Sequence, residues 1–250
     1  MGTPPMKSVQ QAFRVVELLW KLNGAGPTEV ADELDVHKST AHVYLRSLES
    51  VGYAVNRAGT YELSFRFLST GSRLEYRSRV FQAARDEVDR LARETGELPT
   101  LVVEEAGTAV ILHQKEGRDS LELGTYSGMR TPMHTTASGK AIMANLPEER
   151  IAEILGDGVE RVTDRTETRT TILLEELETI REEGFAVDFD RQVVGMGLVA
   201  VPILIDDRPI ASVAIACPTE RIGDESYRTE LLRQLKESRN KISIKYRYGQ

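Results

Sequence analysis

The pattern of apolar and polar positions predicts two short helices at the start of the chain. The first covers SVQQAFRVVELLWKL, with Ser8 as its expected N-cap and NGAGP as its stop. Its apolar residues return with the helical period at Val9, Ala12, Val15, Val16, Leu19 and Leu22. Thr28 is the expected cap of the second helix, TEVADEL, and the inward-facing residues of that helix are Val30, Ala31 and Leu34.

A third helix is predicted after the three-residue turn DVH, where Asp35 tolerates a sharp backbone. Within HKSTAHVYLRSLESVGY, one face carries the apolar side chains Ala41, Tyr44, Leu45 and Leu48. The opposite face comprises Lys38, Ser39, Thr40, His42, Val43 and Arg46. Two helices joined by a short turn, the second presenting polar side chains near its N-terminus, are typical of a helix-turn-helix.

A β-hairpin is predicted next, because YAVNRAGTYELS reads as strand, turn and strand around residues 57–59. Three helices and a hairpin make a winged helix-turn-helix, whose exposed helix fits the DNA major groove and bonds phosphates and base edges. The candidate DNA contacts are Thr28, Lys38, Ser39, Thr40, His42, Val43, Arg46 and Arg57. The polar face alone also fits an ordinary solvated helix, but the spacing of all these elements favours DNA binding.

The remaining sequence alternates strands and helices. A linker helix is expected over residues 65–79, then a longer helix that stops at Gly96. The predicted strands are TLVVEE, AVILHQ, SLELGTY, FAVDFD, GLVAVPILI and PIASVAIAC. The predicted helices are ASGKAIMANL, PEERIAEIL, ILLEELETIREEG and a last one from about Ser226. Short turns between strands indicate an antiparallel sheet covered by helices, so we predict an α+β fold with domains at 1–64 and 80–250.

The charge distribution agrees with this division. Residues 1–79 hold ten Lys and Arg and eight Asp and Glu, a balance of +2, whereas the remaining residues hold 22 and 31, a balance of −9. A slightly basic front joined to an acidic body suits a DNA reader attached to another domain. The single cysteine, Cys217, excludes an internal disulfide and indicates a reducing compartment. With no membrane span and no secretory signal, we expect a cytoplasmic protein that does not bind membranes.

Three stretches of the chain resemble the IclR family of transcriptional regulators. They are VVELLWKLNGAGPTEVADELDVHKSTAHVYLRSLESVGYAVNRAGTYELS, MHTTASGKAIMANLP and EEGFAVDFDRQVVGMGLVAVPI, within a similarity from about Val9 to Ile244. The resemblance implies a GAF-like effector-binding and oligomerisation domain behind the winged helix-turn-helix and its linker helix. It also implies a homodimer or dimer of dimers, an inverted-repeat operator in double-stranded DNA and a small organic metabolite as effector. The sequence leaves repression or activation open.

The same resemblance implies the position of an effector pocket. Ala137, Ser138 and Gly139 stand where family backbone amides hold a ligand carboxylate, and Asp188 matches the family's Asp near the pocket. Residue types point the same way, because unpaired amides at a helix start, here residues 137–140, are suited to binding an anion.

Three positions depart from the acid-sensing relatives. Leu198 stands where they place Cys, and Ala214 and Ala216 stand where they place Ser. Without these donors the pocket is expected to reject small polar acids such as glyoxylate and to favour a ligand with an apolar portion. Further candidate contacts are Met129, His113, Arg130 and His134. In the DNA-binding helix, Val43 stands where the family usually offers a basic residue.

Catalytic motifs are incomplete. TASGKA resembles a phosphate loop, but His134 stands where its first glycine is needed and Ala141 replaces Ser or Thr. GMGLVA runs into a strand rather than the helix that a dinucleotide fingerprint requires. His37 and His42 have no further ligand at metal-binding spacing. We expect no enzyme, cofactor or metal site. The alternative to an effector-responsive regulator is a ligand-independent DNA-binding dimer whose second domain is purely structural.

Overall fold

The computed structural model describes residues 4–156 and 158–249 and divides the chain into two compact units, Met1–Leu74 and Glu75–Gln250. A linker helix is expected over residues 65–79, and the structure has helix α4 there, Arg66–Arg77. The division between the two units falls inside this helix. The predicted domain 1–64 begins, and the predicted domain 80–250 ends, at a residue outside the described part. No helix among the described residues is long and apolar enough to cross a membrane.

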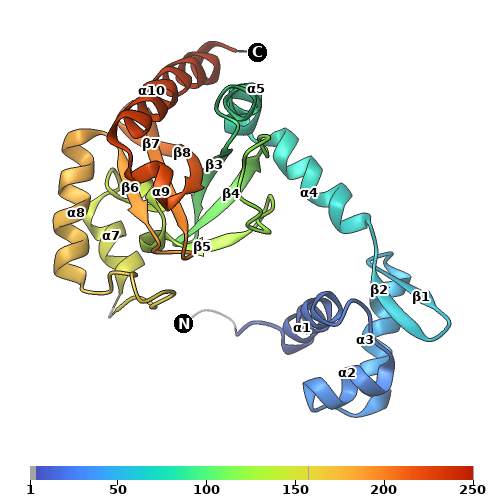
Figure 1. Cartoon of the computed structure of the whole chain (residues 1–250). Coiled ribbons are helices and arrows are strands. Elements are labelled where there is room, and N and C mark those ends of the chain that lie inside the picture. The colour runs from blue at the N-terminus through green and yellow to red at the C-terminus, as the bar shows by residue number, and fades with distance from the viewer. Residues whose placement is uncertain (1–3, 157, 250) are drawn as a thin grey trace. The chain divides into compact units, whose positions relative to one another are not determined.

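The first unit is a winged helix-turn-helix, as predicted (Figure 1). Its elements are α1 Lys7–Lys21, α2 Pro27–Leu34, α3 Lys38–Ser50, β1 Ala54–Arg57 and β2 Thr60–Leu63. The two strands pair antiparallel from Ala54↔Leu63 to Arg57↔Thr60. Buried side chains from all three helices and the hairpin form one core, including Val15, Leu19, Val30, Leu45 and Tyr61. The turn between α2 and α3 is three residues long, and Asp35 takes a left-handed backbone with φ 49°.

Two predicted helix caps are wrong, each by two residues. Ser8 lies inside α1, whose N-cap is Met6. Thr28 lies inside α2, whose N-cap is Gly26 with Pro27 at the first helical position. Proline is favoured there because its missing N–H is one that a helix start leaves unpaired in any case. Thr28 therefore has a free hydroxyl on an exposed first turn.

The second unit is a six-stranded antiparallel sheet with helices on both faces (Figure 1). The strands are β3 Leu98–Glu105, β4 Thr108–Gln114, β5 Arg130–Pro132, β6 Ala186–Phe189, β7 Met196–Ile205 and β8 Arg208–Pro218, in the order β5-β4-β3-β8-β7-β6. The strand predicted at SLELGTY is wrong, because residues 115–129 form an irregular connection and β5 begins only at Arg130. Gly124 has φ 63° there, which interrupts extended backbone.

Each face of the sheet has its own core. One face packs on α5, Arg79–Thr95, and α10, Glu225–Tyr248, with the short α9, Thr219–Gly223, beside β7. The other face packs on α6, Ala137–Met143, and α6 also contacts α8, Thr170–Glu183. The short η1, Met133–Thr135, comes directly before α6, and α7 spans Glu148–Leu155. Side chains alternate between the faces: Leu198, Ala214 and Ala216 join the α6 side, while Val199, Val213 and Cys217 join the α5–α10 side. Burial raises the pKa of Cys217 to about 12, so this thiol is a core residue.

Candidate nucleic-acid interface and ligand cavity

The predicted DNA-binding face of α3 is exposed along its whole length. Lys38, Ser39, Thr40, His42, Val43 and Arg46 are all exposed, as are Thr28 on α2 and Arg57 at the hairpin turn. Val43 has 62% of its surface exposed, although valine favours burial. No side chain caps the first turn of α3, which leaves its N-terminal amides available to an anion.

Both arginines of this surface, Arg46 and Arg57, form weak ion pairs within the first unit. Arg46 Nε lies 3.7 Å from Glu49 Oε2, and Arg57 Nε lies 3.2 Å from Glu62 Oε2. Both arginine side chains are more than two-thirds exposed, so these ion pairs are worth about 0–1 kcal/mol. The guanidinium groups can therefore exchange these carboxylates for phosphate or a base edge at little cost.

The second unit contains a small cavity against the α6 face of the sheet. Its volume is about 80 Å³. Its walls come from β3, β4, β5, β7, β8, the start of α6 and the connections 115–129 and 190–195. The lining residues are Leu98, Thr100, Val102, Ile111, Leu123, Thr125, Met129, Thr131, Thr136, Ser138, Gln192, Val193, Met196, Leu198 and Ala216. Among the described residues, no charged side chain lines this cavity.

Half of the eight effector contacts predicted from the sequence line this cavity. Met129, Ser138, Leu198 and Ala216 line the cavity. Ala137, Gly139, Asp188 and Ala214 lie near it but outside its lining. Ala137 and Ala214 are fully buried in the same core. A Cβ at Gly139 would overlap the carbonyl oxygen of Met133, so this glycine allows η1 and α6 to pack closely.

Part of the expected anion site is already used within the protein. Gly139 donates its amide to Thr136 Oγ1 at 3.1 Å, and Lys140 donates its amide to the Thr136 carbonyl at 3.0 Å. Thr136 thus occupies two of the four amides at residues 137–140. The three other candidates also lie outside the cavity lining. His113 contacts Asp89 at 3.0 Å, His134 bonds the Glu160 carbonyl at 2.8 Å, and Arg130 pairs with Glu105 at 2.6 Å.

Asp188 belongs to a group of four buried or half-buried charges that the sequence did not predict. Lys140 is fully buried, and its Nζ contacts Asp188 Oδ1 and lies 2.5 Å from Glu176 Oε1. Arg191 Nη1 lies 2.6 Å from Glu176 Oε2. We name these four residues the charge quartet. They come from α6, α8, β6 and the connection after β6, so they join the elements behind the cavity wall.

Burial acts differently on the two acids of the charge quartet. Desolvation raises the pKa of Asp188, although Lys140 opposes this shift. Desolvation also disfavours ionised Glu176, but Lys140 and Arg191 outweigh it and lower the pKa of Glu176. A signal for the quartet existed in the sequence: Lys140 is the one charge in ASGKAIMANL, a helix that is otherwise apolar or small on all sides.

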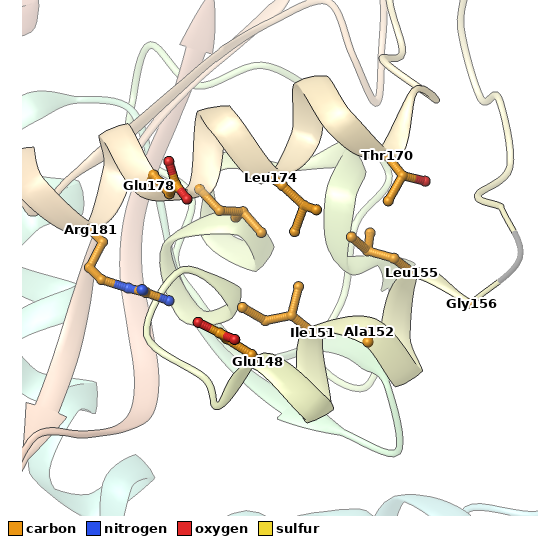
Figure 2. A pocket seen from close by; sticks show the side chains of 10 residues that line it. Glu148, Ile151, Ala152, Leu155, Gly156, Thr170, Leu174, Glu178 and Arg181 are labelled. Atoms are coloured by element: carbon orange, nitrogen blue, oxygen red, sulfur yellow. The ribbon is translucent and has the colours of Figure 1, made fainter.

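A larger groove lies between α7 and α8 (Figure 2), with a volume of about 430 Å³. Ile151, Leu155, Leu174 and Leu177 form its apolar part. The charged members of its lining are Glu148, Glu178 and Arg181, and Arg181 Nε donates to the Ala144 carbonyl at 2.5 Å. None of the DNA-binding or effector-binding residues predicted from the sequence lines this groove.

Comparisons with known proteins cover both units. The family described as "IclR helix-turn-helix domain" matches residues 8–58, and "Bacterial transcriptional regulator IclR C-terminal" matches residues 75–244. The HTH-type transcriptional regulator KdgR of Escherichia coli is 29% identical over 250 residues, covering 97% of this chain and 94% of that protein.

Two solved structures are similar over nearly the whole chain. The crystal structure of Thermotoga maritima IclR is 29% identical with a TM-score of 0.81, covering 98% of this chain and 100% of that chain. An IclR homologue of Microbacterium hydrocarbonoxydans, solved in complex with 4-hydroxybenzoate, shares the fold at 20% identity, with a TM-score of 0.82 over 96% of this chain and 99% of that chain.

Proposed function

Because the chain belongs to the IclR family of transcriptional regulators, we propose that its operator affinity changes when a small molecule fills the cavity of the second unit. DNA binding and transcription regulation are the activities of the family to which the chain belongs. The observation that carries the proposed effector response is the neutral, mostly apolar cavity against the sheet. The complex of the Microbacterium homologue with 4-hydroxybenzoate supports this proposal, because a protein of the same fold binds a small organic molecule.

The proposed DNA contacts are the exposed residues of α2, α3 and the hairpin. Lys38, Ser39 and Thr40 lie at the start of α3, where hydroxyls, ammonium and backbone amides all favour phosphate. Arg46 lies two turns further on and is suited to a base edge or a phosphate. Val43 offers only apolar contact, such as with a thymine methyl group. Thr28, His42 and Arg57 complete the proposed surface.

The proposed effector contacts are Met129, Ser138, Leu198 and Ala216, which line the cavity. Ala137, Gly139, Asp188 and Ala214 are proposed to support the wall from behind. We assign the chain no catalytic role, in keeping with relatives that are named as transcriptional regulators. The proposed location is the cytoplasm, where such a regulator meets its DNA.

The proposed assembly is a homodimer that reads an inverted repeat. A stripe of exposed apolar side chains on α1 supports it: Val9, Phe13 and Trp20 have 51%, 60% and 71% of their surface exposed. These residues follow the helical spacing i, i+4 and i+11, so they share one face. Exposed apolar stripes of this kind mark protein–protein contacts, and two winged helices double the DNA contacts.

A thermal-shift screen of small metabolites against the full chain tests the effector proposal. A ligand that binds only the folded protein stabilises it by mass action, by about 2.7 kcal/mol at a hundred times its Kd. At least one compound should raise the Tm and change operator affinity. A screen in which no compound changes either quantity favours the alternative, a DNA-binding dimer whose second unit is structural.

A further inference from the structure

The cavity of the second unit is built to exclude charge. Its polar lining consists of hydroxyls from Thr100, Thr125, Thr131, Thr136 and Ser138 and the carboxamide of Gln192. A carboxylate or ammonium moved from water into such a wall would lose its hydration with no opposite charge in the lining to replace it. An uncharged ligand loses far less on entering.

The nearest charges are already neutralised by one another. Lys140 and Arg191 are the two cations of the charge quartet, and both contact Glu176, while Lys140 also contacts Asp188. Neither cation lines the cavity. Asp188 has one further oxygen, Oδ2, that is buried with no partner among the described residues, but Asp188 is outside the lining too. The quartet therefore presents neither a free cation nor a free anion to a ligand.

Gln192 is a lining residue with incomplete hydrogen bonding. Its Oε1 is covered and has no hydrogen-bond partner among the described residues. A covered acceptor without a partner is costly, and a ligand that donates to it removes this cost. Gln192 directly follows Arg191 in the chain, so the charge quartet anchors the backbone that carries this carboxamide. Val193, the next residue, also lines the cavity and is 39% exposed.

We propose that the effector is an uncharged molecule with a compact apolar body and a hydrogen-bond donor that binds Gln192 Oε1. This inference rests on the proposed function, and it replaces the ligand carboxylate that the resemblance implied at the amides of residues 137–140. The body packs against the buried side chains of Leu98, Ile111 and Leu198, and the donor lies beside Gln192. A cavity of about 150 Å³ accepts benzene, so 80 Å³ admits a body roughly half that size.

Three probes that share one branched skeleton separate charge from hydrogen bonding. Isobutyramide is neutral and donates, 3-methyl-2-butanone is neutral and has no donor, and isobutyrate is an anion at neutral pH. Calorimetry with the full chain should give isobutyramide the lowest Kd. We expect binding at least about tenfold weaker for isobutyrate, and several-fold weaker for the ketone.

Two glutamine variants make the test specific. Gln192→Leu should raise the Kd of isobutyramide to that of the ketone, and it should leave the Kd of the ketone unchanged or lower. Gln234→Leu is the matched control, because Gln234 on α10 also has a covered, unpartnered Oε1 but lies outside the cavity lining. This control should leave all three Kd values unchanged, and circular dichroism should show both variants folded.

Equal or tighter binding of isobutyrate than of isobutyramide overturns the inference and leaves the effector proposal standing, since a ligand still binds. Unchanged isobutyramide binding in a folded Gln192→Leu variant has the same meaning. No binding of any probe at millimolar concentration also overturns the inference, and the metabolite screen then decides the proposed function separately.

Discussion

Lys140 and Asp188 form a fully buried ion pair, in which the ammonium of α6 contacts one carboxylate oxygen of β6 behind the cavity wall. The contact joins two residues that are 48 positions apart in the sequence. It places Asp188, which family resemblance assigns to the ligand, in contact with a lysine instead. The pair therefore joins α6 to β6, and we propose that it positions the cavity wall.

Lys140→Met should destabilise the chain by about 3–5 kcal/mol, because it removes the buried ammonium that contacts Asp188 and leaves this buried carboxylate with only the more distant Arg191, at 3.8 Å. Urea unfolding would measure this change. Lys241→Met is the matched control: Lys241 is half exposed and pairs with Glu237 at 2.8 Å, so its loss should cost about 0–1 kcal/mol. Equal midpoints for the two variants would contradict the role assigned to the buried pair.

A histidine gives the second unit a measurable pH dependence. Burial lowers the pKa of His134 below its ordinary 6.5, and the ring bonds the Glu160 carbonyl. As pH falls below 6.5, the unfolded chain binds a proton that the folded chain does not, so protonation favours unfolding. His134→Gln keeps a side-chain donor without this titration. Its unfolding free energy should fall less than that of the original chain between about pH 7 and 5. Parallel curves would refute this assignment.

Most of the fold could be predicted from the sequence, because the periodic spacing of apolar residues determines most of its helices and strands. Ala41 and Leu45 are buried and Arg46 is exposed, as the helical period required. The two wrong caps at Ser8 and Thr28 came from choosing a hydroxyl residue where Met6 and Gly26 begin the helices without a side-chain cap. The false strand at SLELGTY came from alternation that the left-handed Gly124 interrupts.

The cavity was only half readable. Leu198 and Ala216 are opposite each other on β7 and β8, so strand periodicity and resemblance together found them. Gln192 and the partners of Lys140 could not be found, because they depend on contacts among α6, α8 and the connection after β6. The spacing of residues along the chain does not indicate which charged side chains form ion pairs in the interior. The unpartnered oxygen of Gln192 is visible only once the packing around it is known.

In the first unit, Arg46→Ala should weaken operator binding by about 1–3 kcal/mol if the guanidinium reads a base, and less if it contacts a phosphate. Ser39→Ala should have a smaller effect. Arg233→Ala, an exposed arginine of α10, is the control and should leave binding unchanged. Gel shifts at two salt concentrations would separate the roles, because loss of a phosphate contact lowers the salt dependence. Unchanged affinity in both α3 variants would rule out this face.

The apolar stripe of α1 predicts the assembly. Phe13→Glu should shift the chain from dimer towards monomer and weaken binding to an inverted repeat, because a charge would enter the proposed contact. Tyr126→Glu changes an exposed aromatic residue of the second unit and should leave the dimer intact. Light scattering measures both. A monomeric original chain bound to DNA would contradict the proposed dimer.

The most direct test of effector control is the affinity of the full chain for promoter DNA, measured by fluorescence anisotropy with and without the metabolite that raises its Tm most. Coupling between the two sites predicts a change in Kd of about 5- to 150-fold, and DNA should change the metabolite's affinity by the same factor. Gln192→Leu should raise the metabolite concentration needed for the response several-fold while leaving DNA affinity without metabolite unchanged. An identical Kd for DNA with and without a metabolite that binds the cavity would contradict the account.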